Sequence, residues 1–112
     1  MTADTGHARI RFSEFQHDFG TMEEGEIVSY VFEFTNTGTA PLLITSASAS
    51  CGCTVPRYPK KPIPPGKKGE LEVEFNSRGK TGRQHKTIAV RANTRPPVTL
   101  LVITADVKEK KK

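Results

Sequence analysis

The chain has 112 residues, with 17 Lys and Arg residues, 12 Asp and Glu residues, two Cys and no Trp. This length corresponds to one domain and excludes the larger catalytic folds, such as a barrel enzyme or a dinucleotide-binding fold with a separate substrate domain. Two cysteines are too few for a multi-disulfide scaffold, so the fold must depend on a hydrophobic core.

In the first half of the chain, apolar and β-branched residues follow the spacing of β-strands rather than that of a helix. Residues 10–12 and 15–19 are predicted to form one broken strand near the start. Ile27–Phe34 is dense in β-branched and aromatic residues, which favour strands, and every second side chain from Val28 onward shares one face. Pro41 opens the next predicted strand, Leu42–Ala47.

The second half continues with three predicted strands. Leu71–Phe75 alternates strictly between apolar residues and glutamates, which places the apolar side chains toward a core and the glutamates on the opposite face. Lys86–Ala92 repeats this alternation, and residues 101–107 provide a third inward-facing set. Clusters of Gly, Pro and Asn separate the runs and indicate turns.

These short strands, without any helical pattern, predict an all-β fold: an immunoglobulin-like antiparallel β-sandwich of about seven strands. We expect the sandwich to span residues 9–107, between a disordered N-terminal segment at residues 1–8 and a disordered lysine-rich tail at residues 108–112. Because Trp is absent, the chain lacks the Cys…Trp…Cys pattern of antibody domains.

The formal net charge of +5 conceals two halves of opposite sign. Residues 1–56 hold seven acidic and two basic residues, whereas residues 57–112 hold five acidic and fifteen basic residues. The basic residues alternate with apolar ones and lack interleaved stacking aromatics, which argues against nucleic acid as a partner. Lysines that solubilise loops and sheet edges are the simpler interpretation, and weak polyanion binding by the basic half is a second alternative hypothesis.

No catalytic constellation is visible in the sequence. Asp18-Phe19-Gly20 and Gly79-Lys80-Thr81 match fragments of kinase and phosphate-binding motifs, but the rest of each motif is missing. The three histidines, His7, His17 and His85, have no zinc-binding spacing. We therefore expect a domain that is not an enzyme and binds no cofactor.

One feature is chemically unusual, the sequence Ser50-Cys51-Gly52-Cys53-Thr54. In an extended strand the two cysteine Cα atoms would lie about 6.6–6.8 Å apart, at the upper limit for a disulfide, so a bridge requires a bend at Gly52. Two thiolates at this spacing could instead hold copper(I), or zinc if further ligands were available. The simplest interpretation is two small buried side chains with free thiols. Structural thiols, a disulfide, and a metal or redox site all remain open.

A series of short segments, in this order along the chain, is familiar from one family. The segments are His17-Asp18-Phe19-Gly20, Glu24-Gly25-Glu26, residues 34–38, Pro41-Leu42, residues 50–54, residues 62–66, Gly69, Phe75, Gly82, Lys86 and Asn93. Over about residues 10–107 the chain resembles a bacterial domain-of-unknown-function family, number 1573, which is similar in fold to the major-sperm-protein and cilium-associated immunoglobulin-like domains. The resemblance implies a periplasmic or cell-surface location, but no mechanism.

We expect no membrane span, because no segment approaches the ~20 apolar residues that a spanning helix needs. Residues 1–15 lack the apolar run of a signal peptide, so no export signal is expected in this chain. We also expect a monomer.

The leading functional hypothesis is a non-catalytic protein-binding or scaffolding module of the cell envelope, whose partner is an unknown protein or envelope component. The alternative, from a different class, is a thiol, soft-metal or redox site at Cys51 and Cys53. Candidate contact residues lie in an expected exposed loop over residues 56–61 and in a turn near residues 78–83. They are Arg57, Tyr58, Lys60, Lys61, Arg78, Lys80 and Arg83.

Overall fold

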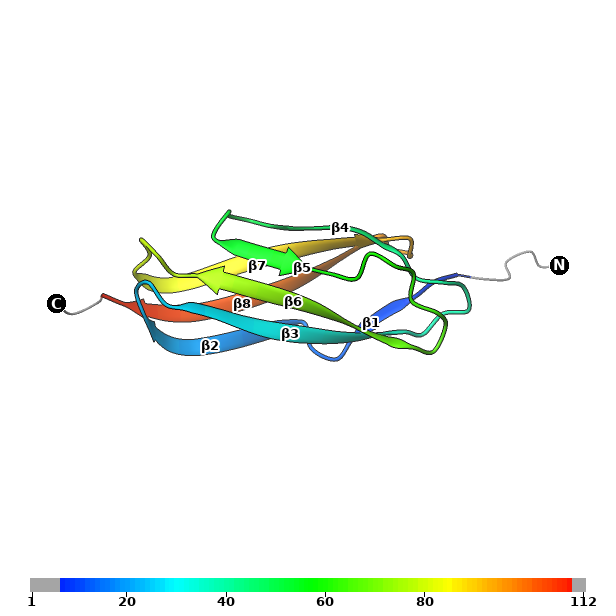
Figure 1. Ribbon diagram of the computed structural model, residues 1–112, viewed down its shortest axis with the longest axis horizontal. Helices are drawn as coiled ribbons and strands as arrows, with labels where there is room; N and C mark the ends of the chain where they lie inside the picture. The colour runs from blue at the N-terminus through cyan, green and yellow to red at the C-terminus, as the bar shows by residue number, and fades with distance from the viewer. Residues whose placement is uncertain (1–6, 110–112) are drawn as a thin grey trace.

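The structure, a computed structural model, describes residues 7–109 and shows two packed sheets (Figure 1). This part of the chain holds eight strands and no helix, and hence no helix able to cross a membrane. The first sheet has the order β1 (Ile10–Phe12), β3 (Ile27–Asn36), β6 (Lys68–Asn76) and β5 (Thr54–Arg57). The second has the order β2 (Gln16–Glu23), β8 (Val98–Lys108), β7 (Gly82–Ala92) and β4 (Ile44–Ala49). The predicted all-β sandwich is confirmed.

The core lies between the two sheets and is built from the alternate residues that the sequence pattern indicates. On β6, Leu71, Val73 and Phe75 are buried while the glutamates between them face outward. The same alternation holds on β7, where Ile88 and Val90 are buried, and along β8. Burial of these large apolar side chains is the main stabilising contribution to the sandwich.

The predicted broken strand near the start is two strands in different sheets. β1 pairs antiparallel with β3, whereas β2 pairs with β8 and runs parallel to it. The sandwich is therefore not wholly antiparallel, and the chain crosses from one sheet to the other between Phe12 and Gln16. Alternation in a sequence indicates which face is apolar but does not indicate which sheet a strand joins.

A second correction concerns residues 54–57, part of which was expected to be loop. They form β5, which pairs antiparallel with β6 at the edge of the first sheet. The strand is only four residues long and contains Pro56, two features that weaken a strand signal but are tolerated at a sheet edge. Together with the division of the first predicted strand into β1 and β2, it brings the total in residues 7–109 to eight strands, against about seven expected.

The chain termini were predicted to be disordered. This is wrong for Ala8, which is buried and forms an isolated bridge with Thr94, and for Lys108, which belongs to β8 and pairs with Glu23. Residues 1–6 and 110–112 lie outside the described residues, and their expected disorder stays a prediction.

Candidate functional site

A buried asparagine ties together the loops at one end of the sandwich. The side-chain amide of Asn36 donates to the backbone oxygens of Ala40 and Ile63 at 2.8 and 2.9 Å. Its side-chain oxygen accepts the backbone N–H groups of Arg9 and Gly38 at 3.3 and 2.9 Å. Four bonds use the full hydrogen-bonding capacity of this side chain. Asn36 therefore holds the fold and has no polar group left for a ligand.

A buried serine has the same role at the opposite end. The Ser77 hydroxyl donates to the backbone oxygen of Glu26 at 2.7 Å and accepts the backbone N–H of Gly25 at 2.9 Å. Nearby, a carboxylate oxygen of Glu24 accepts the backbone N–H of Gly79 at 2.9 Å. These bonds join the β2–β3 turn to the β6–β7 turn. The segment Glu24-Gly25-Glu26 therefore has a structural role.

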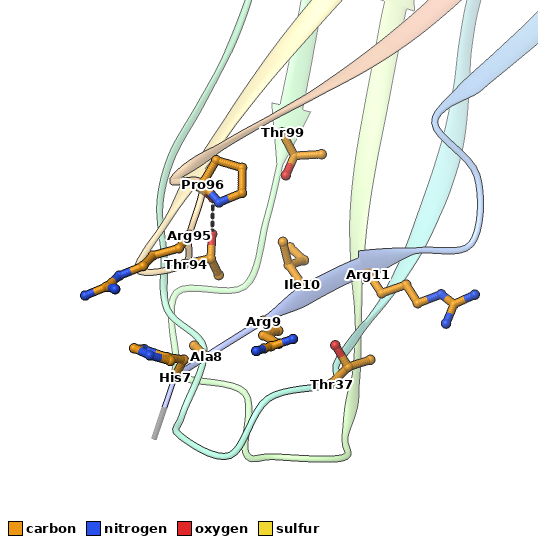
Figure 2. Close-up of a pocket in the computed structure, with 10 residues that line it drawn as sticks. All are labelled: His7, Ala8, Arg9, Ile10, Arg11, Thr37, Thr94, Arg95, Pro96 and Thr99. Atoms are coloured by element: carbon orange, nitrogen blue, oxygen red, sulfur yellow. Dashed lines mark hydrogen bonds between the residues drawn. The ribbon is translucent and has the colours of Figure 1, made fainter. Parts of the chain in front are cut away.

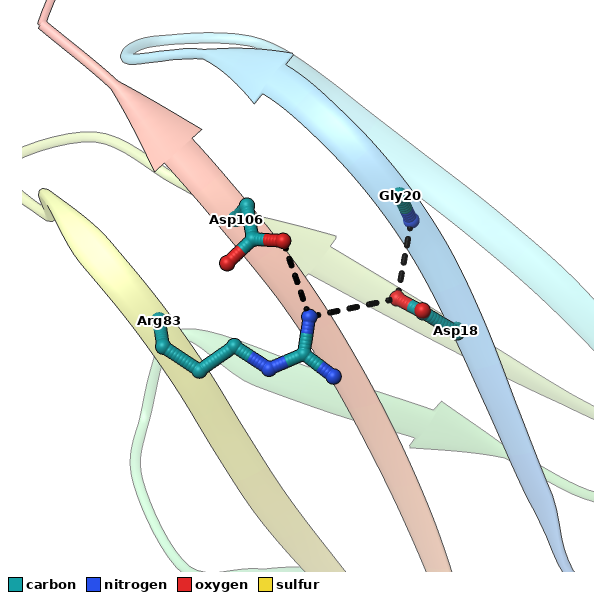
Figure 3. A network of polar contacts seen from close by, with 4 residues as sticks. All are labelled: Asp18, Gly20, Arg83 and Asp106. Carbon is teal, nitrogen blue, oxygen red and sulfur yellow. Dashed lines mark hydrogen bonds and ion pairs between the residues drawn. The ribbon is translucent and has the colours of Figure 1, made fainter.

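Arg83 on β7 lies between two carboxylates on the outer face of the second sheet (Figure 3). Its Nη1 is 3.0 Å from Oδ2 of Asp106 on β8 and 3.7 Å from Oδ1 of Asp18 on β2. The Asp18 carboxylate also accepts the backbone N–H of Gly20 at 2.9 Å. That hydrogen bond is the main cause that holds the pKa of Asp18 below its ordinary value, and the charge of Arg83 adds to it. Arg83 thus links three strands.

His17 on β2 and Tyr30 on β3 contact each other, although the two strands belong to different sheets. The two rings stack with centroids 3.6 Å apart, and the Tyr30 hydroxyl donates to the Glu14 carboxylate. This hydrogen bond raises the pKa of Tyr30. His17 therefore packs against a neighbouring aromatic ring. Residues 7–109 contain no group of three or more His, Cys, Asp or Glu side chains placed to hold a metal ion.

The candidate contact residues of the predicted loop are partly engaged within the fold. Arg57 on β5 lies 3.5 Å from a carboxylate oxygen of Glu72 and 3.3 Å from one of Glu74. Tyr58 is half-buried and packs against the core, and the Lys60 ammonium lies 3.6 Å from the centroid of its ring. The segment is therefore less available to a partner than an exposed loop would be.

The structure does not gather the seven candidate contact residues into one surface. Arg57, Tyr58, Lys60 and Lys61 belong to β5 and the loop that follows it, beside the first sheet. Arg78 and Lys80 lie in the β6–β7 turn at the end of the molecule, and Arg83 belongs to the second sheet. The seven residues therefore lie in three separate places of the fold, and their role in binding stays a prediction.

A cavity of about 620 Å³ opens at the end of the sandwich where β1 begins (Figure 2). Arg9, Arg11 and Arg95 line it and form no ion pair with any residue in the described range 7–109. The Arg11 and Arg95 side chains point to opposite sides, so their guanidinium groups do not converge on one point (Figure 2). The cavity is basic but is not organised around an anion.

The outer face of the first sheet combines exposed apolar side chains with glutamates. Five large hydrophobic side chains are exposed within residues 7–109, and three of them lie on this face: Ile27 at 58%, Val31 at 42% and Val55 at 41%. We call the surface the β3–β6–β5 face. It consists of Ile27, Val31, Glu33, Glu70, Glu72, Glu74, Val55 and Arg57.

Two carboxylates on this face oppose each other directly. Glu33 on β3 is the registered partner of Glu70 on β6, and like charges at such a position destabilise a sheet. No ion pair holds either side chain within the described part of the chain, in contrast to Glu72 and Glu74, which Arg57 neutralises. A groove of about 510 Å³ runs beside the pair. It is lined by Glu33, Glu70, Lys68, Gly69, Pro59 and Ile63.

The two cysteines form a disulfide in the turn that joins β4 to β5. Their Cα atoms are 5.4 Å apart, which is shorter than the spacing of an extended strand because the backbone turns at Gly52. The expected bend is confirmed, whereas the interpretation of two buried free thiols is wrong: both residues are half-buried and neither thiol is free. The disulfide was one of the three open alternatives.

Sequence comparison identifies one family. The family described as "Protein of unknown function (DUF1573)" matches residues 10–107, which is nearly all of the sandwich. No curated protein matches the chain. The earlier resemblance to this family is therefore confirmed.

Comparison with solved structures supports the fold. A protein of unknown function from Porphyromonas gingivalis W83 superposes with a TM-score of 0.75 and 20% identity, covering 95% of this chain and 49% of that one. PapD-like domain 7 of human CEP192, an ASH domain, gives 0.76 at 12% identity, covering 94% and 89%. The Escherichia coli chaperone DraB gives 0.59 at 12% identity, covering 91% and 56%. The chain thus spans about half the length of the Porphyromonas protein.

Proposed function

The chain belongs to the DUF1573 family, and we propose that it is a non-catalytic protein-binding module whose β3–β6–β5 face contacts a partner. The observation that carries the proposal is the directly opposed pair Glu33 and Glu70, next to the exposed Val31 and a groove. An arrangement that costs stability in the free domain is relieved when a cation from a partner lies between the two carboxylates.

The groove beside the pair fits a Lys or Arg side chain of a partner segment. Pro59 and Ile63 offer apolar contacts for the aliphatic stem, and the two carboxylates offer acceptors for the charged head. Lys68 also lines the groove and opposes a cationic ligand. The partner is therefore expected to carry basic and apolar residues side by side.

The exposed apolar side chains extend the contact surface. Val31 is the registered neighbour of Glu72, and Val55 is the neighbour of Glu74, so each valine lies beside a carboxylate. Desolvation of such side chains supplies affinity, while the surrounding charges select the partner. Immunoglobulin-like folds serve many functions, so the likeness to a chaperone adds support only by analogy of fold.

We also place the domain in the cell envelope, periplasmic or at the cell surface. The disulfide between Cys51 and Cys53 supports this location, since disulfides form in oxidising compartments and are rare in the cytosol. Fractionation of cells that express the natural full-length protein tests it. Recovery in the cytoplasmic fraction would contradict the location, and recovery in the periplasmic or surface fraction is expected.

The binding proposal is tested with defined peptides of about six residues, a common strand length. Fluorescence anisotropy of the purified chain is measured with an alternating Lys-Val peptide, a Glu-Val peptide and a Lys-Ser peptide. Only the Lys-Val peptide is expected to bind. Glu33→Gln combined with Glu70→Gln should raise its Kd at least about tenfold, equal to about 1.4 kcal/mol. The proposal would be contradicted if the three peptides bound equally or if none of them bound.

Matched variants separate the face from general charge and hydrophobicity. Val31→Ser should weaken binding, whereas Leu100→Ser should not, because Leu100 is 56% exposed on the other sheet. Glu109→Gln removes one carboxylate at the far end of the described chain and should leave the Kd unchanged. Lys68→Gln should tighten binding because it removes the competing cation from the groove. A weaker Lys68→Gln complex would contradict the assigned site.

A further inference from the structure

The Cys51–Cys53 disulfide occupies the turn where the chain passes from the edge of one sheet to the edge of the other. We propose that it is a reversible redox site that exchanges with a dithiol of a partner protein. The proposal is independent of the β3–β6–β5 face, since it requires only the turn and its two sulfur atoms.

The bridge joins residues that the backbone already holds together. The Thr54 N–H donates to the Cys51 oxygen at 3.2 Å, which closes the turn without the sulfur atoms. The turn is fixed at both ends, because the Ser50 N–H donates to the Thr87 oxygen at 2.9 Å and an N–H of β6 donates to the Cys53 oxygen at 2.9 Å. The disulfide spans only two residues of sequence, so it restrains the unfolded chain little. Because this bond contributes little to the stability of the fold, it can open and close while the fold persists.

The two sulfur atoms have different surroundings. Cys53 packs against the hydrophobic core, whereas Cys51 is not among the residues that contact it. Gly52, between them, is exposed, and a Cβ atom built on it would meet nothing within 4 Å. The space beside Gly52 is therefore open to an attacking thiolate, and because Cys53 packs against the core, we assign Cys51 as the attacked sulfur.

Polar groups near both sulfur atoms suit the thiolates that exchange would form. The Cys53 backbone N–H donates to Cys51 Sγ at 3.3 Å and remains in place if the bridge opens. The Thr54 hydroxyl lies 3.7 Å from Cys53 Sγ and can donate to a Cys53 thiolate. Each sulfur atom thus has one donor when it carries negative charge.

The exchange balances in two displacements. A thiolate of the partner dithiol attacks Cys51 Sγ, a new sulfur–sulfur bond forms, and Cys53 leaves as a thiolate. The second partner thiolate then attacks the partner's own sulfur in this mixed disulfide and releases Cys51 as a thiolate. The partner loses two electrons and becomes a disulfide, while Cys51 and Cys53 gain them and take two protons from solvent.

The first experiment asks whether reduction occurs in the folded chain. The oxidised full chain is equilibrated with mixtures of reduced and oxidised dithiothreitol in native buffer, quenched with an alkylating reagent and weighed by mass spectrometry. We expect both cysteines to be alkylated, the circular dichroism spectrum to be retained, and the bridge to re-form when the mixture is made oxidising. Reduction only after addition of denaturant, loss of the spectrum on reduction, or failure to re-oxidise would each overturn the proposal.

A second experiment tests the assigned direction of attack. Thioredoxin that retains only its attacking cysteine is mixed with the oxidised chain, and the mixed disulfide is located by peptide mass spectrometry. The bond is expected at Cys51, and a bond at Cys53 would overturn the assignment. In a matched pair of variants, the thiol left in Cys53→Ser should react with an alkylating reagent several-fold faster than the thiol left in Cys51→Ser.

Discussion

Replacement of Asn36 by alanine tests most directly whether this side chain stabilises the loops at its end of the sandwich. The substitution removes a fully buried side chain that makes four hydrogen bonds, two as donor and two as acceptor. The carbonyls of Ala40 and Ile63 lose a donor, and the N–H groups of Arg9 and Gly38 lose an acceptor. Loss of a typical hydrogen bond costs about 0.5–1.5 kcal/mol, more when the remaining partner is left unsatisfied, so we expect a loss of about 3–5 kcal/mol.

Equilibrium unfolding in urea, followed by circular dichroism, measures this loss. A loss of that size would be a large part of the ~5–15 kcal/mol that stabilises a domain. Asn93→Ala provides the control: Asn93 is exposed and its side chain makes two such bonds, to the backbone of Leu43 and Pro41. Its replacement should cost about 1–2 kcal/mol. Equal costs for the two variants, or a cost below about 1 kcal/mol for Asn36→Ala, would refute the reasoning.

The remaining predictions concern the core, the loss of stability at acidic pH and the disulfide. Phe75→Ala should cost about 2–5 kcal/mol in urea unfolding, and a cost below about 0.5 kcal/mol would contradict its core position. The pKa of Asp18 is lowered in the folded chain, chiefly by the hydrogen bond from the Gly20 N–H. The Asp18 carboxylate therefore stabilises the fold at a pH above its pKa in the unfolded chain, and this stabilisation is lost as the pH falls through its pKa in the folded chain. The gap in unfolding free energy between the chain and Asp18→Asn should therefore narrow between about pH 5 and pH 2, and a constant gap would contradict this. Reduction of Cys51–Cys53 should lower the free energy of unfolding by only about 1.6 kcal/mol, which is the chain-entropy value for a three-residue loop. A loss above about 4 kcal/mol would contradict this and show that the disulfide is important for stability.

Much of the sandwich could be predicted because its strands have one buried face. The strict alternation of Leu71–Phe75 specifies which side chains enter the core, and the structure confirms it. The separation of β1 from β2 could not be predicted in this way, because pairing between distant strands depends on loop geometry and packing that a local pattern does not contain. β5 escaped prediction because four residues with an internal proline give too weak a signal.

The candidate site was less predictable than the fold. The sequence pattern placed Glu70 on the outer face, but nothing local indicated that Glu33 would be its direct partner, since this depends on the register of β3 with β6. The ion pairs of Arg57 and Arg83 could not be predicted, because the carboxylates that they contact are distant in sequence. The cysteines were correctly singled out, although their spacing alone did not decide between thiols and a bridge.

The parallel pairing of β2 with β8 has a mechanical consequence. The ends of the described chain lie at opposite ends of the sandwich, and β2 is registered with β8 from Gln16↔Val102 to Glu23↔Lys108 (Figure 1). Tension applied through the two ends acts along these strands, so the hydrogen bonds between them are strained together in shear rather than opened one after another. A sandwich connected in this way is expected to resist stretching between its ends.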